Sequence, residues 1–312
     1  MTEGLVLGGT NNLFEVETDS LVSLCRIKGK VLKGAEGYYN PLAPGDRVSV
    51  EPDAHDAAKG MITALLARKN HFVRWNQKGC APQLLASNLD SVVIVTTPAE
   101  PPFRPRFVDR ALVQAQAERI EPVIVVNKAD LGLDDDAEDR VTDWERIGYT
   151  VYRVSARTGA GLEELRVALA GRLSAFVGQS GVGKSSLINA LDPSLALRTQ
   201  AVSAKHDRGT HTTTKGVLLH LAGRPGEKRL DVIDTPGVRR FMLHDVAAGS
   251  LALYFPEMED LVGSCSWGMS CSHENEPGCK ILEAVYSGVV HEARYESWLR
   301  IKEEIETGRF SD

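Results

Sequence analysis

A glycine-rich segment at residues 178–185, GQSGVGKS, contains the residue types that bind phosphate groups. It follows an apolar run, LSAFV, and precedes KSSLINAL, so the glycines lie between an expected strand and an expected helix. Glycines let backbone N–H groups turn toward an anion, and the helix N-terminus adds its positive end. We expect Lys184 to reach the β- and γ-phosphates and the Ser185 hydroxyl to bind Mg²⁺. The predicted phosphate-loop residues are Gly178, Gln179, Ser180, Gly181, Val182, Gly183, Lys184, Ser185 and Ser186.

A second candidate phosphate element is DVIDTPGV, in which Asp234 ends an apolar run. Its carboxylate could hold Mg²⁺ through water, and the N–H of Gly237 could meet a γ-phosphate. An ordinary turn after a strand is the alternative. Val238 follows, where Ras-like enzymes place a glutamine that orients water, and an apolar side chain cannot polarise water. Slow unaided hydrolysis is therefore expected, with another group positioning the water.

The segment PVIVVNKAD, residues 122–130, ends an apolar run in groups that could select a base. The Asp130 carboxylate could accept two hydrogen bonds from guanine, whereas adenine presents an acceptor and a C–H at those positions. We expect Asn127 to brace neighbouring loops and touch the base. The stem of Lys128 would cover the face of the ring. The segment therefore predicts guanine recognition.

Ser155 and Ala156 stand at the end of the next apolar run, where the Ala156 N–H could donate to guanine O6. These base-reading segments precede the phosphate loop, which is the reverse of the usual GTPase order. Ligands bind at the carboxyl ends of strands in open α/β sheets, so strands joined in another order can keep the same pocket. The sequence thus predicts a circularly permuted guanine-nucleotide domain.

Four residues near the C-terminus have the types and spacing of a metal site. Three thiolates and an imidazole on a short loop form a closed tetrahedral shell, hence a structural zinc site without an open position. Unpaired thiols are the alternative. Without metal we expect this loop to be disordered, because little apolar surface is available to hold it. The predicted ligands are Cys265, Cys271, His273 and Cys279.

The rest of the chain must supply the elements that position these groups. Residues 1–70 show short alternating runs broken by Gly and Pro turns, which predicts a small all-β barrel. A Cys/His cluster and a helical tail, expected to break near Gly288, follow from about residue 245. We therefore expect domains at 1–70, 71–244 and 245–312. Between barrel and tail, strands alternating with helical periodicity predict a parallel α/β sheet, with strands at 91–97, 122–127, 149–156 and 229–237.

Composition is that of a globular protein: 312 residues, 43% hydrophobic and 25% charged. No run approaches the roughly 18 apolar residues of a membrane span, and the N-terminus lacks a signal-peptide pattern, so a cytosolic protein is expected. Three of the five cysteines lie within fifteen residues, which favours a metal site over disulfides. We expect the isolated Cys25 and Cys80 to be buried as small apolar residues.

The chain resembles the circularly permuted GTPases of small-ribosomal-subunit biogenesis, the RsgA family, over nearly its whole length. The resemblance implies an N-terminal OB-fold, a permuted P-loop GTPase domain and a C-terminal zinc domain that dock on the small subunit. It also implies GTP or GDP, Mg²⁺ and one structural Zn²⁺, with hydrolysis slow alone and faster on the ribosome during late assembly. The matching segments are GDRV, NLDSVVIV, PVIVVNKADL, SARTGAGLEEL, FVGQSGVGKSSLIN, RGTHTTT, DVIDTPGVRRF and CSHENEPGC.

Two details depend on this resemblance. The polar segment at 204–216 suits a switch, and alignment with the family favours Thr213 as a Mg²⁺ ligand over its threonine neighbours, a strand edge being the alternative. His211 is the best internal candidate to orient water, against a merely structural histidine. The family places four residues between the first two zinc ligands, and this chain has five between Cys265 and Cys271, which a bulge could absorb. The predicted catalytic residues are Lys184, His211 and Thr213.

RNA contact must come from local patches, because the net charge is −6. Residues 57–89 contain no acidic residue and mix cations with aromatics, which suits phosphate contact and base stacking. The alternative is a solvated surface whose Phe72 and Trp75 pack as core. The cations of the two clusters are Lys59, Arg68, Lys69, Arg74 and Lys78, with His71 interleaved, and Arg26, Lys28, Lys30 and Lys33.

The leading interpretation is a monomeric GTPase that acts on the small ribosomal subunit and its rRNA. A P-loop ATPase or kinase is disfavoured by Asp130 and by the lack of a recognisable acceptor-substrate site. An RNA-binding protein with a silent nucleotide pocket is the third possibility. Because DTPGVRRF runs directly into the C-terminal domain, we expect GTP to favour the subunit-docked state and hydrolysis to release it.

Overall fold

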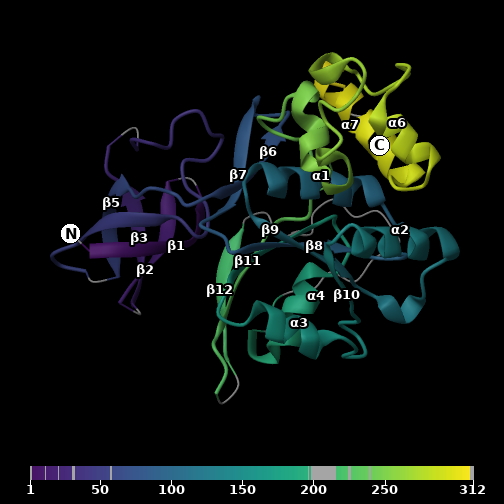
Figure 1. The fold of residues 1–312 in the computed structure, drawn as a ribbon. Helices are drawn as coiled ribbons and strands as arrows, with labels where there is room; N and C mark the ends of the chain where they lie inside the picture. The colour runs from purple at the N-terminus through teal and green to yellow at the C-terminus, as the bar shows by residue number, and fades with distance from the viewer. Residues whose placement is uncertain are drawn as a thin grey trace.

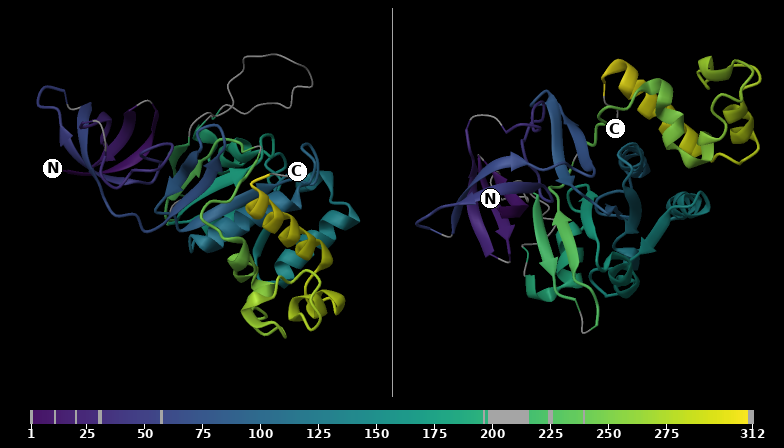
Figure 2. Two further views of the ribbon diagram at one scale, coloured as in Figure 1. Left: turned by 90° about the horizontal axis from the view of Figure 1, so that it is seen from above. Right: turned by 60° about the vertical axis from the view of Figure 1, so that its left-hand side comes forward.

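The computed structural model describes residues 2–309 apart from 11, 20, 30–31, 57, 196, 198–215, 224–225 and 239. Along the chain it forms a β-barrel, an α/β unit and a helical module, coloured from purple to yellow in Figure 1. Two further views separate these parts clearly (Figure 2). The order and type of the parts match the predicted fold class.

The N-terminal barrel is closed by pairing between its first and fourth strands. Its strands are β1 (Thr2–Thr10), β2 (Leu13–Thr18), β3 (Leu21–Ile27), β4 (Arg47–Pro52) and β5 (Lys59–Leu65). They follow the order β1-β2-β3-β5-β4, and β4 also pairs with β1. Side chains alternate across each strand, so Phe14, Val16, Val50 and Ile62 are buried at the centre.

The central sheet places the strand of the phosphate loop in its middle. Its strands are β8 (Ser91–Thr96), β9 (Glu121–Val126), β10 (Thr150–Arg153), β11 (Leu173–Gly178), β12 (Val217–Leu221) and β13 (Leu230–Asp234). Their order is β10-β9-β8-β11-β13-β12, and β12 alone of these six runs antiparallel. All four predicted apolar runs form strands. The last two are shorter than predicted, because the chain leaves the sheet at Arg153 and Asp234 to form loops.

Helices cover both faces of this sheet, and in Figure 1 α1 lies above it and α3 and α4 lie below it. On one face Val92 shares a core with Leu112 and Trp144, and on the other Val93 shares a core with Leu187. Both faces are apolar because a parallel sheet is covered on each side. The helices are α1 (Pro105–Ala117), α2 (Asp135–Arg146), α3 (Leu162–Leu169) and α4 (Lys184–Leu191), with the short turns η1 (Ala129–Leu131) and η2 (Pro193–Leu195).

A separate hairpin, β6 (His71–Asn76) and β7 (Ala81–Ser87), stands between the barrel and α1. It was not predicted from the sequence. Phe72 is buried, so the core alternative holds for this aromatic, whereas Trp75 is half-buried. Cys25 is buried as expected, but the expectation for Cys80 is wrong: it lies exposed in the hairpin turn, where the chain reverses direction at the surface.

The C-terminal module packs against α1 through its own core. It contains η3 (Ala248–Tyr254), α5 (Pro256–Glu259), η4 (Gly268–Ser270), α6 (Lys280–Tyr286) and α7 (Glu292–Thr307). The predicted break near Gly288 is confirmed, because α6 ends before it and its φ of +77° lies in the left-handed region that favours glycine. His291 caps α7 by accepting a hydrogen bond from the Ala293 N–H at 3.1 Å.

Among the residues that the structure describes, no helix is long and apolar enough to cross a membrane.

Candidate nucleotide site and metal centre

The phosphate loop links the buried strand β11 to the N-terminus of α4. Gly181 and Gly183 adopt φ values of +88° and +90°, which side chains with a Cβ rarely adopt. A Cβ at Gly183 would lie 2.4 Å from the Asn127 side-chain nitrogen. The loop therefore requires glycine here, both for its backbone conformation and for the close approach of Asn127.

Lys184 is buried at the start of α4 and folds back over the loop. Its Nζ donates to the carbonyl oxygens of Gly178 at 2.9 Å and Gln179 at 3.1 Å. Burial lowers the pKa of Lys184 to about 8, and the nearby Asp234 opposes this only in part. A polyphosphate beside this ammonium group would restore its charge, which is the behaviour expected of a phosphate-binding lysine.

Ser185 and Asp234 form the candidate magnesium position. The Ser185 hydroxyl donates to Asp234 Oδ2 at 2.8 Å. The other carboxylate oxygen of Asp234 is buried and has no hydrogen-bond partner within the described part of the chain, and burial raises the pKa of this group. A buried acceptor normally has a partner, and oxygen ligands of this kind suit Mg²⁺ or its bound water. The donor set thus fits the predicted ion.

The loop after β13 touches the phosphate loop directly. A Cβ at Gly237 would lie 2.8 Å from the Ser180 Cα, so only glycine fits this approach. The next residue, Val238, donates its backbone N–H to the Gly178 carbonyl at 3.1 Å. Its side chain is 1% exposed and belongs to the core that contains Phe241. Val238 therefore cannot orient a water molecule, because its side chain has no polar atom and packs into the apolar core.

Asn127 joins the base-reading segments to the phosphate loop. Its side-chain nitrogen donates to the Val182 carbonyl at 2.8 Å, and its side-chain oxygen accepts from the Ala156 N–H at 3.2 Å. The Ala156 N–H, which we expected at guanine O6, is engaged by Asn127 in this structure. Through these bonds Asn127 links three segments that lie far apart in the sequence, which is the geometry expected of a bracing residue.

Asp130 is held as an ionised carboxylate at the edge of this group. Ser155 donates to its Oδ1 at 2.5 Å, and Arg157 pairs with its Oδ2 at 2.5 Å. The Ser155 hydrogen bond, followed by the Arg157 charge, keeps the pKa of Asp130 below its usual value. Arg157 is 74% exposed, so a guanine ring could replace it. The Lys128 ammonium group donates to the Glu100 carbonyl.

Sequence reasoning missed the contacts of Arg157 and of the Glu100 carbonyl. The arginine of the SAR segment could have been noticed because it stands two residues after Ser155. No sequence pattern indicates that the backbone carbonyl of Glu100 accepts a hydrogen bond from Lys128. The predicted residues His211 and Thr213 lie outside the described residues, so their roles in catalysis and Mg²⁺ binding stay predictions.

The four predicted zinc ligands form one buried cluster. Their ligand atoms all lie within 4.8 Å of one another, and the Cys265 and Cys279 sulfurs are 3.9 Å apart. Tetrahedral Zn–S bonds of about 2.3 Å place two sulfurs about 3.8 Å apart, so the donor set fits zinc. The turn η4 accommodates the five-residue spacing before Cys271. Backbone N–H groups of Lys280 and Leu282 donate to two of the sulfurs, which orients them.

The structure divides the predicted RNA-binding cations into two groups. Arg68 is partly buried and donates two hydrogen bonds to the buried Asp46, and Lys69 pairs with Asp90 at 3.0 Å. Lys28 and Lys59 also have carboxylate partners. Lys30 lies outside the described residues. Four of these cations have no carboxylate partner among the residues described: Arg26, Lys33, Arg74 and Lys78.

The matches to known proteins agree with this geometry. The model of the family described as RsgA GTPase matches residues 65–244. A "Small ribosomal subunit biogenesis GTPase RsgA" from Bacteroides fragilis is 37% identical, covering 99% of this chain and 98% of the relative. The protein with the same description from Chlorobaculum tepidum is 39% identical, covering 96% of each chain.

Two solved structures extend the likeness to the whole fold. The crystal structure of YjeQ from Thermotoga maritima is 33% identical, covers 99% of both chains and gives a TM-score of 0.73. The structure of YloQ, described as a circularly permuted GTPase, is 26% identical, covers 100% of this chain and 97% of the other, and gives a TM-score of 0.68. The predicted fold class is thus confirmed, and the chain belongs to the RsgA GTPase family.

Proposed function

We propose that the chain binds GTP with Mg²⁺ in this pocket, hydrolyses it to GDP and phosphate, and acts on the small ribosomal subunit during its late maturation. The proposal that a nucleotide binds here rests on the two hydrogen bonds of the Asn127 side-chain amide. They tie Val182 of the phosphate loop and Ala156 of the base-reading loop to one amide. A single nucleotide can therefore be held at both ends.

Each residue has a chemical role in this proposal. Asp130 reads the guanine edge, and the backbone N–H groups of the phosphate loop surround the phosphates. Lys184 stabilises the charge that develops on the γ-phosphate, while Ser185 and Asp234 hold Mg²⁺. Thr213 completes the ion's shell when GTP is bound. Magnesium supplies charge neutralisation of the phosphate oxygens.

Hydrolysis should be slow in the isolated protein. The buried Val238 provides no polar group near the attacking water, so a glutamine-like contribution is missing. We infer that His211 or a group of the bound subunit orients the water. Stimulation by the subunit then follows from completing the site rather than from tighter nucleotide binding.

The partner is inferred from the names of the relatives, which describe small-ribosomal-subunit biogenesis. Arg26, Lys33, Arg74 and Lys78 are the candidates for rRNA contact, because phosphates would supply the anions that they lack. We further propose a cytoplasmic monomer with domains at 1–70, 71–244 and 245–312, of which the last is held by one structural Zn²⁺.

The test is a GTPase assay with no addition, with purified small subunits, and with purified large subunits. We expect small subunits, but not large subunits, to stimulate GTP hydrolysis, and the variant Lys184→Ala to abolish that hydrolysis. Hydrolysis of labelled GTP should be inhibited by unlabelled GTP but not by ATP. Equal stimulation by both subunits would contradict the partner. Competition by ATP would favour an ATPase or kinase. Subunit binding and turnover unchanged in Lys184→Ala would favour an RNA-binding protein with a silent pocket.

A further inference from the structure

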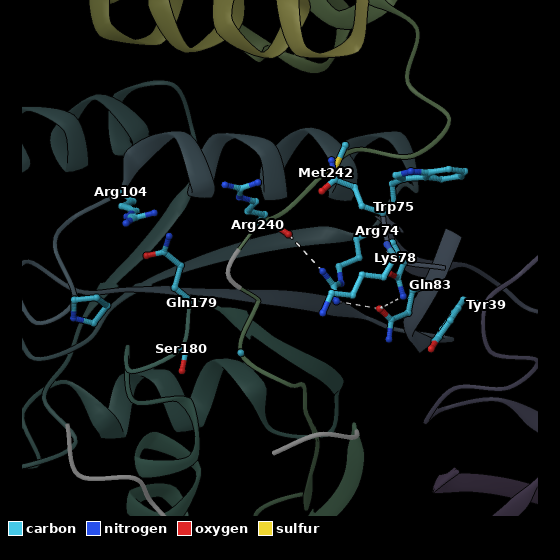
Figure 3. Close-up of a pocket in the computed structure, with 14 residues that line it drawn as sticks. Tyr39, Arg74, Trp75, Lys78, Gln83, Arg104, Gln179, Ser180, Arg240 and Met242 are labelled. Carbon is cyan, nitrogen blue, oxygen red and sulfur yellow. Dashed lines mark hydrogen bonds between the residues drawn. The ribbon is translucent and has the colours of Figure 1, made fainter. Parts of the chain in front are cut away.

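A cavity of about 980 Å³ lies between the β6–β7 hairpin, the chain after β13 and the phosphate loop (Figure 3). It contains four cationic side chains, those of Arg74, Lys78, Arg104 and Arg240. No acidic residue is among the described residues that line it. Two of the four, Arg74 and Lys78, have no carboxylate partner among the described residues, so the cavity offers these two cations to an anionic ligand.

Arg74 is the most informative of these groups, because it is half-buried. Its Nη2 donates to Gln83 Oε1 at 3.0 Å and its Nη1 donates to the Arg240 carbonyl at 3.4 Å. Its Nε is buried and has no hydrogen-bond partner among the residues that the structure describes. Burial also lowers the pKa of Arg74. A desolvated guanidinium without an anion is unfavourable, and a phosphate offers the matching fork of acceptors.

The cavity is continuous with the phosphate end of the nucleotide site. Ser180 and Gly237 line it, and these two residues also form the contact between the phosphate loop and the loop after β13. On the other side of the cavity, the backbone N–H of Trp75 donates to the Met242 carbonyl at 3.0 Å. The Trp75 ring stacks on the His244 ring with their centroids 6.1 Å apart. The hairpin that carries Arg74 is thus fixed to the chain that follows Gly237.

We propose that this cavity is a second phosphate-binding site that adjoins the nucleotide's own cradle at Ser180 and Gly237, with Arg74 and Lys78 as its principal ligands. The proposal rests on the proposed function, which places the γ-phosphate beside Ser180 and Gly237. The ligand class is a phosphate group from one of two sources. One is the inorganic phosphate that GTP hydrolysis releases at this end, and the other is a phosphodiester of RNA.

The experiment uses the full chain loaded with Mg²⁺ and a nonhydrolysable GTP analogue, so that the nucleotide's cradle is already filled. Inorganic phosphate and, separately, a short oligouridylate are titrated into this complex by calorimetry. The variants are Arg74→Gln and, because Arg74 is half-buried, the exposed Lys78→Gln. Arg300→Gln, which removes an exposed charge on α7 outside the cavity, is the matched control.

We expect phosphate, the oligonucleotide or both to bind the loaded wild-type protein, and each cavity variant to weaken that binding by about tenfold. Arg300→Gln should bind as the wild type does. If phosphate binds saturably and the oligonucleotide does not, the ligand of the site is the inorganic phosphate released by GTP hydrolysis. If the oligonucleotide displaces phosphate, the ligand is a phosphodiester of RNA. Binding of neither ligand, or equal binding by wild type and both cavity variants, overturns the proposal. Failure of the GTP analogue itself to bind would instead contradict the proposed function.

Discussion

Asn127 uses both ends of one amide to hold two loops, and Asp130 lies three residues beyond it. This spacing puts the Asp130 carboxylate, which we propose reads the base, at a fixed position relative to the phosphate loop. The side chain of Asp130 is prepared for its role, because Ser155 and Arg157 keep it ionised. The proposed selectivity between bases depends on a few side chains and can be tested one residue at a time.

The variant Asp130→Asn should change the preferred nucleotide base from guanine to xanthine. The new amide donates one hydrogen bond and accepts another, which matches the carbonyl at C2 of xanthine, whereas guanine presents two donors. We expect GTP affinity to fall by about 100-fold or more and XTP to bind better than GTP. Competition against a fluorescent GDP analogue measures this, with Glu138→Gln on the exposed face of α2 as a control. An unchanged preference for GTP would place the base elsewhere.

Nucleotide binding should take up a proton at alkaline pH. Lys184 in the free protein has a pKa of about 8, and bound phosphates raise it. Affinity is then constant below pH 8 and falls as pH rises above it, because the ammonium form must be restored. Calorimetry with GDP at pH 8.5 in two buffers of different ionisation enthalpy measures the uptake, with pH 7.2 as the control. Identical enthalpies at pH 8.5 would contradict a phosphate-binding role for this amine.

The phosphate loop and the base-reading segments could be predicted from sequence because short local spacings specify them. GQSGVGKS fixes a backbone conformation, and NKAD fixes the side chains that follow a strand. The pairing of Arg68 with Asp46 could not be predicted, because the partners lie 22 residues apart on different segments. That pairing removes one cation from the RNA-binding cluster that the composition suggested.

A buried ionic network joins the elements of the nucleotide domain to the C-terminal module. Asp109 of α1 accepts hydrogen bonds from Arg140 of α2, from Trp144 at 3.1 Å and from Arg294 of α7 at 2.6 Å. Arg294 also pairs with Glu257 at 2.7 Å. Burial alone would raise the pKa of Asp109, but the two guanidinium groups hold it below its usual range. One carboxylate thus fixes three helices.

Asp109→Asn should destabilise the protein strongly. The substitution leaves two buried guanidinium groups short of a counter-charge, which costs about 3–5 kcal/mol. Asp139 is an exposed residue of α2 that pairs with His291. The variant Asp139→Asn should lower the free energy of unfolding by about 1 kcal/mol or less. Urea unfolding followed by tryptophan fluorescence compares the two, since Trp144 and Trp298 lie in these cores. Equal shifts in the unfolding midpoint would show that the network does not hold the helices together.

Four strands of the central sheet, β8, β9, β11 and β13, were predictable because each is a mostly buried apolar run. The hairpin β6–β7 was not, since a bulge between Phe72 and Val73 breaks the alternation of its side chains. The pairing of β1 with β12, around Gly8 and Val217, joins segments about 200 residues apart. Local patterns specify an element's type, and long-range partners depend on packing that no local pattern describes.

All three parts of the molecule have apolar cores, and the loop that carries the zinc ligands contributes to its core through the ligand side chains of Cys265, Cys271 and Cys279. The order of this loop should therefore depend on the metal. Stability of the C-terminal module and nucleotide binding are then separable properties of one chain.

Zinc removal should unfold the ligand loop and leave nucleotide binding intact. We expect one zinc per wild-type chain and about none in Cys279→Ser, with the C-terminal transition lost or lowered in thermal unfolding. GDP affinity should change by less than about twofold, because the metal cluster and the phosphate loop belong to different cores. Metal analysis and calorimetry measure both, and Cys80→Ser, an exposed cysteine outside the cluster, is the control. A metal-free protein with an unaltered C-terminal module would contradict this prediction.

We propose that two segments far apart in the sequence bind the two ends of one nucleotide. The crystal structure of the GDP complex examines this most directly. It should place the guanine N1 and amino group within hydrogen-bond distance of the Asp130 carboxylate, with the β-phosphate of the same molecule on Lys184. A β-phosphate on Lys184 with the purine away from Asp130 would contradict a shared site.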